Sequence, residues 1–131
     1  MQSPDLVLLA VNGTLMRGLE LNPNLLAVGA TFVEENATEP AYRLWSIADR
    51  HPAMQRFATG GVSVAVEVWA VPAAGLGRIL LQEPPGLSIG KVKLANGREV
   101  PGVLGEAILC ADRTEITQHG GWRSYIATLG K

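Results

Sequence analysis

The sequence is poor in soft metal ligands and in reactive thiols. It contains one cysteine, Cys110, and two histidines, His51 and His119, with no CxxC or HxxxH spacing. A single cysteine excludes an internal disulfide and suits a reducing compartment. Because a zinc site draws on three or four closely spaced ligands, we predict no metal site, and nothing in the sequence calls for another cofactor.

An excess of charge of one sign and long apolar runs are also missing. The 11 basic and 12 acidic side chains give a formal net charge of −1, without any block of like charge. Nucleic-acid-binding domains carry a basic excess on one face, so we expect no nucleic-acid partner. The apolar run Leu6–Val11 is too short for a membrane span, and no basic segment precedes it as in a signal peptide. We therefore expect a cytoplasmic protein without a membrane partner.

What the sequence does contain is enough apolar material for one core. It has 131 residues, of which 47% are hydrophobic, so we predict a single domain over residues 1–131. Apolar runs and alternation predict strands at residues 6–11, 30–35, 42–48, 62–71, 89–94 and 100–110. Short helices are predicted at residues 23–28, 72–81 and 121–129. Several strands with few short helices indicate an α+β domain around a mixed or barrel-like sheet.

Turn-forming residues separate these segments. Asn22 is expected to cap a helix that starts at Pro23. The His51-Pro52 pair is expected in a loop, and Asn96-Gly97 predicts a type I′ hairpin.

Several segments resemble one superfamily when they are taken together and in order. Val11–Gly18 is similar to the strand-to-loop signature Y-G-[ST]-L-x-x-G of gamma-glutamylcyclotransferase-like proteins. Tyr42–Trp45 with His51–Met54 resembles the strand and Y-P-G turn of that superfamily, and Val66–Trp69 resembles its G-E-V-[YW] strand. The resemblance implies the gamma-glutamylcyclotransferase-like fold.

A narrower resemblance lies in the second half of the chain. Pro85–Arg98 and Thr114–Tyr125 are similar to the segments P-L-G-I-G-x-V-x-L-x-D-G and D-I-T-x-x-G-G-W-R-x-Y of the allophanate hydrolase C-terminal domain. In that family an amidase domain deaminates allophanate, and the C-terminal domain promotes loss of carbon dioxide from the product, N-carboxycarbamate. These 131 residues contain no amidase domain. The resemblance therefore implies at most the second step, in urea or allophanate-type nitrogen metabolism.

Two departures from the family patterns keep other functions open. The family tends to carry a His where this chain has Thr14, which leaves room for a non-catalytic module that docks on an amidase. A gamma-glutamylcyclotransferase needs a Glu base after the short helix, where this chain has Pro85, with Glu83 two residues away. The sequence favours an enzyme acting on a small carbamate or ureide, with docking and cyclotransfer as alternatives.

The predicted site centres on the turn after the first strand. Consecutive backbone N–H groups at a glycine turn can converge on a carboxylate, so we expect a cradle for a small carboxylate or carbamate ligand, although a plain tight turn would look the same. The residues expected in this cradle are Asn12, Gly13, Thr14 and Leu15. Thr14 and His51 are predicted to be catalytic, with Thr14 holding the substrate because a hydroxyl is a poor proton donor.

Five further residues are candidates for the same site. Tyr42 and Arg43 are expected to contact the ligand, Arg43 through bidentate hydrogen bonds unless it is a surface residue. Glu67 and Trp69 share one strand face, which either lines the pocket or meets solvent. Glu106 lies in an apolar stretch and either faces water or is a paired catalytic residue.

Overall fold

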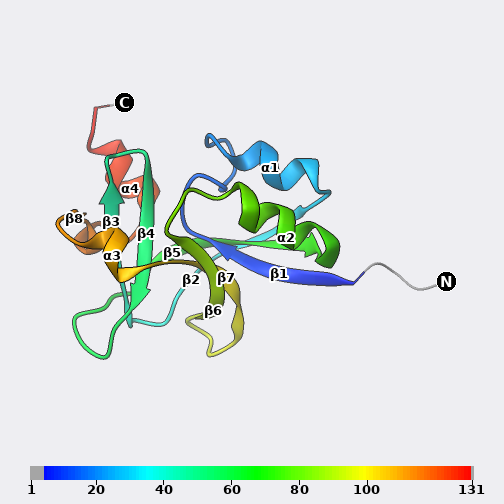
Figure 1. The fold of residues 1–131 in the computed structure, drawn as a ribbon. Helices are drawn as coiled ribbons and strands as arrows, with labels where there is room; N and C mark the ends of the chain where they lie inside the picture. The colour runs from blue at the N-terminus through cyan, green and yellow to red at the C-terminus, as the bar shows by residue number, and fades with distance from the viewer. Residues whose placement is uncertain (1–4, 131) are drawn as a thin grey trace.

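A computed structural model describes residues 5–130 of the chain (Figure 1). Residues 1–4 and Lys131 lie outside the described residues, as does the part of the signal-peptide prediction that rests on the first residues. Within the described range, no helix combines the length and the apolar character that crossing a membrane requires.

A five-stranded mixed sheet forms the larger part of the fold. Its strands are β1 (Leu6–Val11), β2 (Thr31–Ala37), β5 (Ala65–Pro72), β6 (Leu87–Lys93) and β7 (Glu99–Gly105), in the order β2-β5-β1-β7-β6. The central strand β1 runs antiparallel to β5 and parallel to β7. The edge strands β2 and β6 approach each other beyond their ends, where Thr38 and Leu94 form an isolated bridge. The sheet therefore curls like a barrel without closing into one.

A smaller sheet and short helices complete the domain. The second sheet has the order β4-β3-β8 and contains β3 (Tyr42–Ile47), β4 (His51–Arg56) and β8 (Thr114–Glu115). The helices are α1 (Asn22–Ala27), α2 (Ala73–Gln82), α3 (Ala107–Cys110) and α4 (Trp122–Ala127). Figure 1 shows α2 beside β1 with α1 against α2, and α3 and α4 beside the smaller sheet. The predicted α+β class with a mixed sheet is confirmed.

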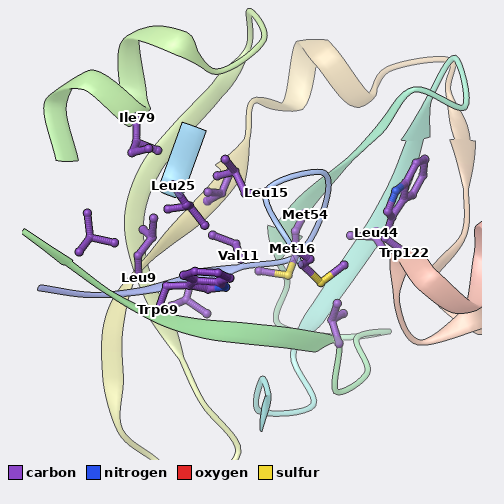
Figure 2. Close-up of a cluster of buried hydrophobic side chains, with 14 of the residues drawn as sticks. Leu9, Val11, Leu15, Met16, Leu25, Leu44, Met54, Trp69, Ile79 and Trp122 are labelled. Carbon is purple, nitrogen blue, oxygen red and sulfur yellow. The ribbon is translucent and has the colours of Figure 1, made fainter. Parts of the chain in front are cut away.

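One apolar core joins the two sheets. Leu9 and Leu25 are fully buried at the α1 and α2 side of β1, and Leu44 and Met54 continue the same cluster into the smaller sheet (Figure 2). Each fully buried side chain of this size stabilises the fold by roughly 1.5–3 kcal/mol relative to an exposed one. Trp122 is 3% exposed and closes the cluster from α4, which fixes the last helix against the core.

Two predicted segments differ from the structure because tertiary contacts override local signals. His51-Pro52 is not a loop: it opens β4, and His51 pairs with Ile47 across the β3–β4 hairpin. The strand predicted over residues 100–110 ends at Gly105, and Glu106 precedes the short helix α3. The Glu106 N–H still donates across to the carbonyl of Gly86 at 2.9 Å, but the Glu106 carbonyl accepts from the Leu109 N–H at 3.1 Å, which begins the helical turn.

Two turns form at the predicted places with a different geometry. Asn22 is the first residue of α1 and its cap is Leu21, because the Asn22 side chain donates instead to the Leu15 carbonyl at 2.8 Å. In the hairpin at Asn96-Gly97, Gly97 has a positive φ and Asn96 does not. The Gly97 N–H donates a hydrogen bond to the carbonyl of Leu94. This is a three-residue hairpin loop with a glycine bulge, not a type I′ turn.

Candidate functional site

A crevice lies where the turn after β1, the start of β4 and the end of α2 meet. Its inner end is narrow, and its outer part opens to about 520 Å³; Thr14, His51 and Glu83 line both parts. The inner end is closed by apolar groups, among them Pro52, Leu87 and Val103. The outer part is bordered by charged and polar groups, namely Glu20, Arg50, Gln82 and Arg113. The crevice thus has a narrow inner end with apolar walls and a charged mouth.

The turn Gly13–Leu15 presents free backbone donors at the inner end. The carbonyls of these residues accept hydrogen bonds inside the turn, from the Met16 N–H to Gly13, from the Leu21 N–H to Thr14, and from the Asn22 side chain to Leu15. Within residues 5–130, the N–H groups of the same three residues donate to no protein acceptor. Successive unpaired N–H groups are an arrangement that binds anions.

Packing around Asn12 and Gly13 explains why the turn takes this shape. The buried Asn12 amide donates to the Val103 carbonyl at 3.0 Å, which ties the end of β1 to β7. A Cβ on Gly13 would lie 2.5 Å from Cδ of Pro52. Only glycine therefore allows the β1 turn and the start of β4 to meet this closely.

We expect Gly13→Ala to destabilise the fold by about 1–3 kcal/mol, because a rigid proline ring cannot move aside for the added methyl group. Urea unfolding of the variant measures this loss. Gly77→Ala in α2 is the matched control: no atom lies within 4 Å of its new Cβ, so a gain of about 0.5–1 kcal/mol is expected. Equal stabilities of the two variants would contradict the close-approach argument.

Two carboxyl residues, Glu20 and Glu83, border the crevice, and of these two Glu83 also lines its inner end. Glu83 lies directly after α2, and its side chain lines both parts of the crevice. Burial raises its pKa from the ordinary 4.5 to about 7. Within the described residues, no cation lies in ion-pair range of Glu83. A carboxyl that holds its proton near neutral pH is suited to general acid or base chemistry.

A strained hairpin turn holds the opposite wall. Ala48 and Asp49 both have positive φ, at 55° and 58°, and the Arg50 N–H donates to the Ile47 carbonyl at 3.0 Å. Non-glycine residues in this region cost about 1–3 kcal/mol each and persist where surrounding contacts fix them. The turn places Arg50 and His51 at the crevice, Arg50 at its mouth and His51 deeper inside.

Several residues predicted for the site lie elsewhere. Tyr42 is fully buried, and its hydroxyl accepts a hydrogen bond from the Lys93 N–H at 3.0 Å. Arg43 donates to both carboxylate oxygens of Glu115, at 2.8 and 2.7 Å. Glu106 is exposed and does not line the crevice. The structure therefore brings Asn12–Leu15 and His51 together, but not these three residues.

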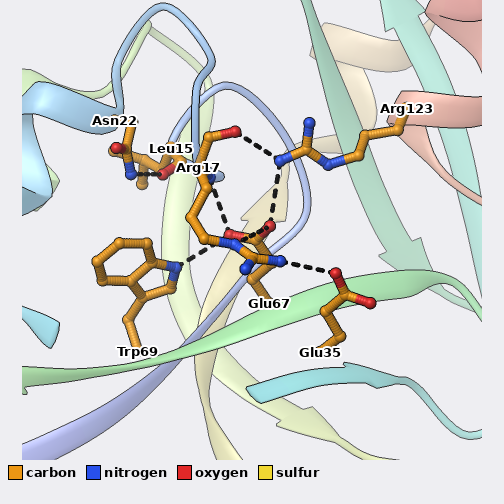
Figure 3. A network of polar contacts seen from close by, with 7 residues as sticks. All are labelled: Leu15, Arg17, Asn22, Glu35, Glu67, Trp69 and Arg123. Atoms are coloured by element: carbon orange, nitrogen blue, oxygen red, sulfur yellow. Dashed lines mark hydrogen bonds and ion pairs between the residues drawn. The ribbon is translucent and has the colours of Figure 1, made fainter. Parts of the chain in front are cut away.

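Glu67 is buried, yet it does not line the crevice. Its carboxylate accepts hydrogen bonds from the Arg17 N–H, the Arg17 guanidinium, the Trp69 indole and the Arg123 guanidinium, at 2.9, 3.1, 3.2 and 3.1 Å (Figure 3). Burial alone would raise the pKa of Glu67, but these hydrogen bonds outweigh it and lower the pKa. The face does not meet solvent, and Glu67 is a buried polar group, but two arginines cover it in place of the predicted pocket.

Glu83, Arg50 and Arg113 border the crevice without having been predicted as site residues. The sequence identifies Glu83 only as a neighbour of Pro85, and Pro85 itself borders the outer part of the crevice. No local signal distinguishes Arg50 or Arg113 from other surface arginines. As for metals, the described residues contain no group of three or more His, Cys, Asp or Glu side chains that would hold an ion.

Two proteins of known structure share this architecture, one at high and one at low sequence identity. A uropathogenic E. coli-specific protein of known structure is 55% identical, with a TM-score of 0.93, over 94% of this chain and 97% of that chain. An AIG2-like protein from Mus musculus is 20% identical, with a TM-score of 0.59, over 82% of this chain and 80% of that chain. The second likeness shows the fold alone, and the predicted fold is confirmed.

Larger proteins contain the same domain as one part of their length. Urea amidolyase of Saccharomyces cerevisiae is 29% identical over 130 residues, which are 94% of this chain and 7% of that protein. Allophanate hydrolase of Kluyveromyces lactis is 29% identical, with a TM-score of 0.89, over 95% of this chain and 22% of that chain. The chain thus spans a small share of the length of these relatives. The family model of the allophanate hydrolase C-terminal domain matches residues 7–127, and this chain belongs to that family.

Proposed function

We propose that this domain promotes loss of carbon dioxide from N-carboxycarbamate or a closely related small carbamate, with Glu83 as the proton donor. The observation that carries the proposal is the half-buried Glu83 carboxyl with a pKa of about 7, in a crevice shared with the free N–H groups of Gly13–Leu15. The sequence raised the question of what replaces the family His at Thr14. In this proposal Glu83 supplies the proton.

The proposed step balances without a cofactor. The bond between nitrogen and one carboxylate carbon breaks, and its electron pair remains on nitrogen. Nitrogen takes the proton of the Glu83 carboxyl, carbon dioxide leaves, and carbamate remains. The Glu83 carboxylate then regains a proton from water. A proton donor works best when its pKa lies near the working pH, which the pKa of Glu83 satisfies.

The inner end of the crevice offers two different surroundings for the two carboxylates of such a substrate. The N–H groups of Gly13–Leu15 would hold one carboxylate, and the Thr14 hydroxyl would add a hydrogen bond. The apolar wall at Pro52 and Val103 would strip water from the other carboxylate, which favours its loss as neutral carbon dioxide. Arg50 and Arg113 at the mouth would attract the dianion, and His51 would orient it.

The substrate implies an amidase as the supplier. N-carboxycarbamate is a short-lived product of deamination, and the matching relatives include a urea amidolyase of which this chain spans 7%. We propose that an amidase on another part of the assembly delivers the substrate. Docking on that amidase without catalysis is the alternative, and it predicts binding without any acceleration of the second step.

Cyclotransfer keeps one supporting observation. The sequence aligns Pro85 with the base position, and Glu83, two residues before Pro85, lines the inner crevice. A Glu83 carboxylate would also serve as base for attack of a gamma-glutamyl amine on its own side-chain carbonyl. Release of 5-oxoproline from gamma-glutamyl-alanine distinguishes this function from decarboxylation.

Malonate, a stable mimic of the substrate dianion, tests the proposed binding mode. We expect Arg50→Gln and Arg113→Gln each to weaken malonate binding about 2- to 5-fold, as for exposed charge pairs, and to change acetate binding less. Calorimetric titration measures both affinities, and a malonate-soaked crystal should place one carboxylate at the Gly13–Leu15 amides.

The matched control is Arg98→Gln, an exposed arginine of the β6–β7 hairpin that lies outside the crevice. Its malonate affinity should equal that of the wild type. Malonate bound elsewhere with the turn empty, or the same loss in all three arginine variants, would show that the crevice is not the binding site.

A further inference from the structure

The last helix, α4, contributes no residue to the lining of the crevice, yet its side chains bond to residues that lie next to the lining on both sides. Arg123 donates through Nη2 to the Arg17 carbonyl at 2.6 Å and to the Glu67 carboxylate at 3.1 Å (Figure 3). Glu67 in turn accepts from the Arg17 N–H. Arg17 is therefore held by both its carbonyl and its N–H group, two residues after the Gly13–Leu15 turn.

The opposite wall is held by Tyr125, which lies two residues after Arg123 in α4. Its hydroxyl donates to Oδ1 of Asp49 at 2.6 Å, and the Ser46 hydroxyl donates to the same oxygen at 2.7 Å. Asp49 is one of the two residues with positive φ in the turn that carries Arg50. The strained turn is thus fixed from outside by a hydrogen bond from α4.

The helix itself is firmly seated. Trp122 is buried in the main core, and its ring lies 5.7 Å from that of Tyr125. The carbonyl of Gly120 accepts from the Ala65 N–H at 2.9 Å, which joins the start of α4 to the start of β5. A rigid element that bonds to two loops fixes the distance between them.

We propose that α4 is a positioning element that braces both walls of the crevice, through Arg123 on the side of the Gly13–Leu15 turn and Tyr125 on the side of Arg50 and His51. Arg123 and Tyr125 act through other residues and touch no substrate. The proposal rests on the proposed function only for the ligand, because the bracing itself concerns the geometry of the ligand-free crevice.

The test compares Arg123→Ala, Tyr125→Phe and the double variant by calorimetric titration with malonate. Each single change removes hydrogen bonds but no core side chain, so the fold should persist. We expect each to weaken malonate binding roughly 3- to 10-fold, the range of coupling through a positioning contact. The pH at which Glu83 is half ionised should stay unchanged, because neither Arg123 nor Tyr125 contacts that carboxyl.

Backbone amide shifts report the geometry without any ligand. Arg123→Ala should move the amide signals of Gly13–Leu15, and Tyr125→Phe those of Arg50 and His51. The control is Ser124→Ala, the exposed position between them, which should change neither affinity nor those signals.

The readouts separate the two proposals. If the wild type does not bind malonate, the proposed ligand class is wrong, while the amide shifts still decide the bracing. Suppose that both variants fold, that their amide signals move only within α4, and that their malonate affinity equals that of Ser124→Ala. In that case α4 does not brace the crevice.

Discussion

Glu83→Gln is expected to lower the acceleration of carbon dioxide release about 10²- to 10⁴-fold, the usual contribution of a general acid. The amide has the shape of the carboxyl but has no proton to give at neutral pH. The rate in the wild type should fall as pH rises through about 7, where Glu83 loses its proton, and the variant should lack this dependence. Steady-state rates between pH 5.5 and 8.5 provide the measurement.

The same change should stabilise the fold above pH 7. The folded chain holds the Glu83 proton up to a pKa of about 7, whereas the unfolded chain releases it near 4.5. Ionisation therefore favours unfolding, and stability falls as pH rises between 4.5 and 7. Glu83→Gln removes this cost, on the order of 1–3 kcal/mol at pH 8, which urea unfolding measures.

Glu106→Gln distinguishes the structural assignment from the sequence-based one. Glu106 was predicted to be catalytic, but it is exposed and lies outside the crevice. If the Glu106 variant loses activity and the Glu83 variant keeps it, Glu83 is not the proton donor.

Glu67→Gln is expected to destabilise the fold by about 2–4 kcal/mol. The change replaces one acceptor oxygen by an amide N–H₂ group, which then faces the donors of Arg17 and Arg123 at a position 3% exposed. The pKa of Glu67 is lowered in the folded chain, so its contribution is present above about 4.5 and is lost as pH falls. Urea unfolding at pH 7 and at pH 3 measures both effects.

The control for this prediction is Glu115→Gln on β8. Glu115 also pairs with an arginine, but its side chain is 33% exposed, so a loss of about 1 kcal/mol or less is expected. Hydrogen bonds from Arg43 and Thr117 lower the pKa of Glu115 to about 2, and its contribution should fade between pH 4.5 and 2. Equal losses of stability at Glu67 and Glu115 would mean that burial of the hydrogen bonds to Glu67 adds nothing to the stability of the fold.

Regular elements could be predicted from the sequence because their signals are local. The apolar run Leu6–Val11 is β1 as predicted, and the helix predicted over residues 72–81 is α2, Ala73–Gln82. The alternation in residues 62–71 also placed Glu67 and Trp69 correctly on one face, where the Trp69 indole donates to Glu67.

The site could be predicted only in part, because its other residues depend on distant contacts. The turn at Gly13 carries its own signal, whereas the burial of Glu83 arises only when the β1 turn and the start of β4 meet the end of α2. The face of Glu67 is covered by Arg17 and Arg123, which lie 50 and 56 residues away in sequence. No periodicity in the sequence reports such contacts.

Carbon dioxide release from allophanate, in an assay that couples this protein to an amidase domain lacking its own C-terminal domain, tests the central claim most directly. N-carboxycarbamate also breaks down unaided, so the quantity that matters is the rate above that of the amidase domain alone. We predict that the wild type accelerates this second step and that Glu83→Gln does not. Release at the unaided rate in the presence of folded, malonate-binding wild type would contradict the decarboxylation account and leave docking on an amidase in its place.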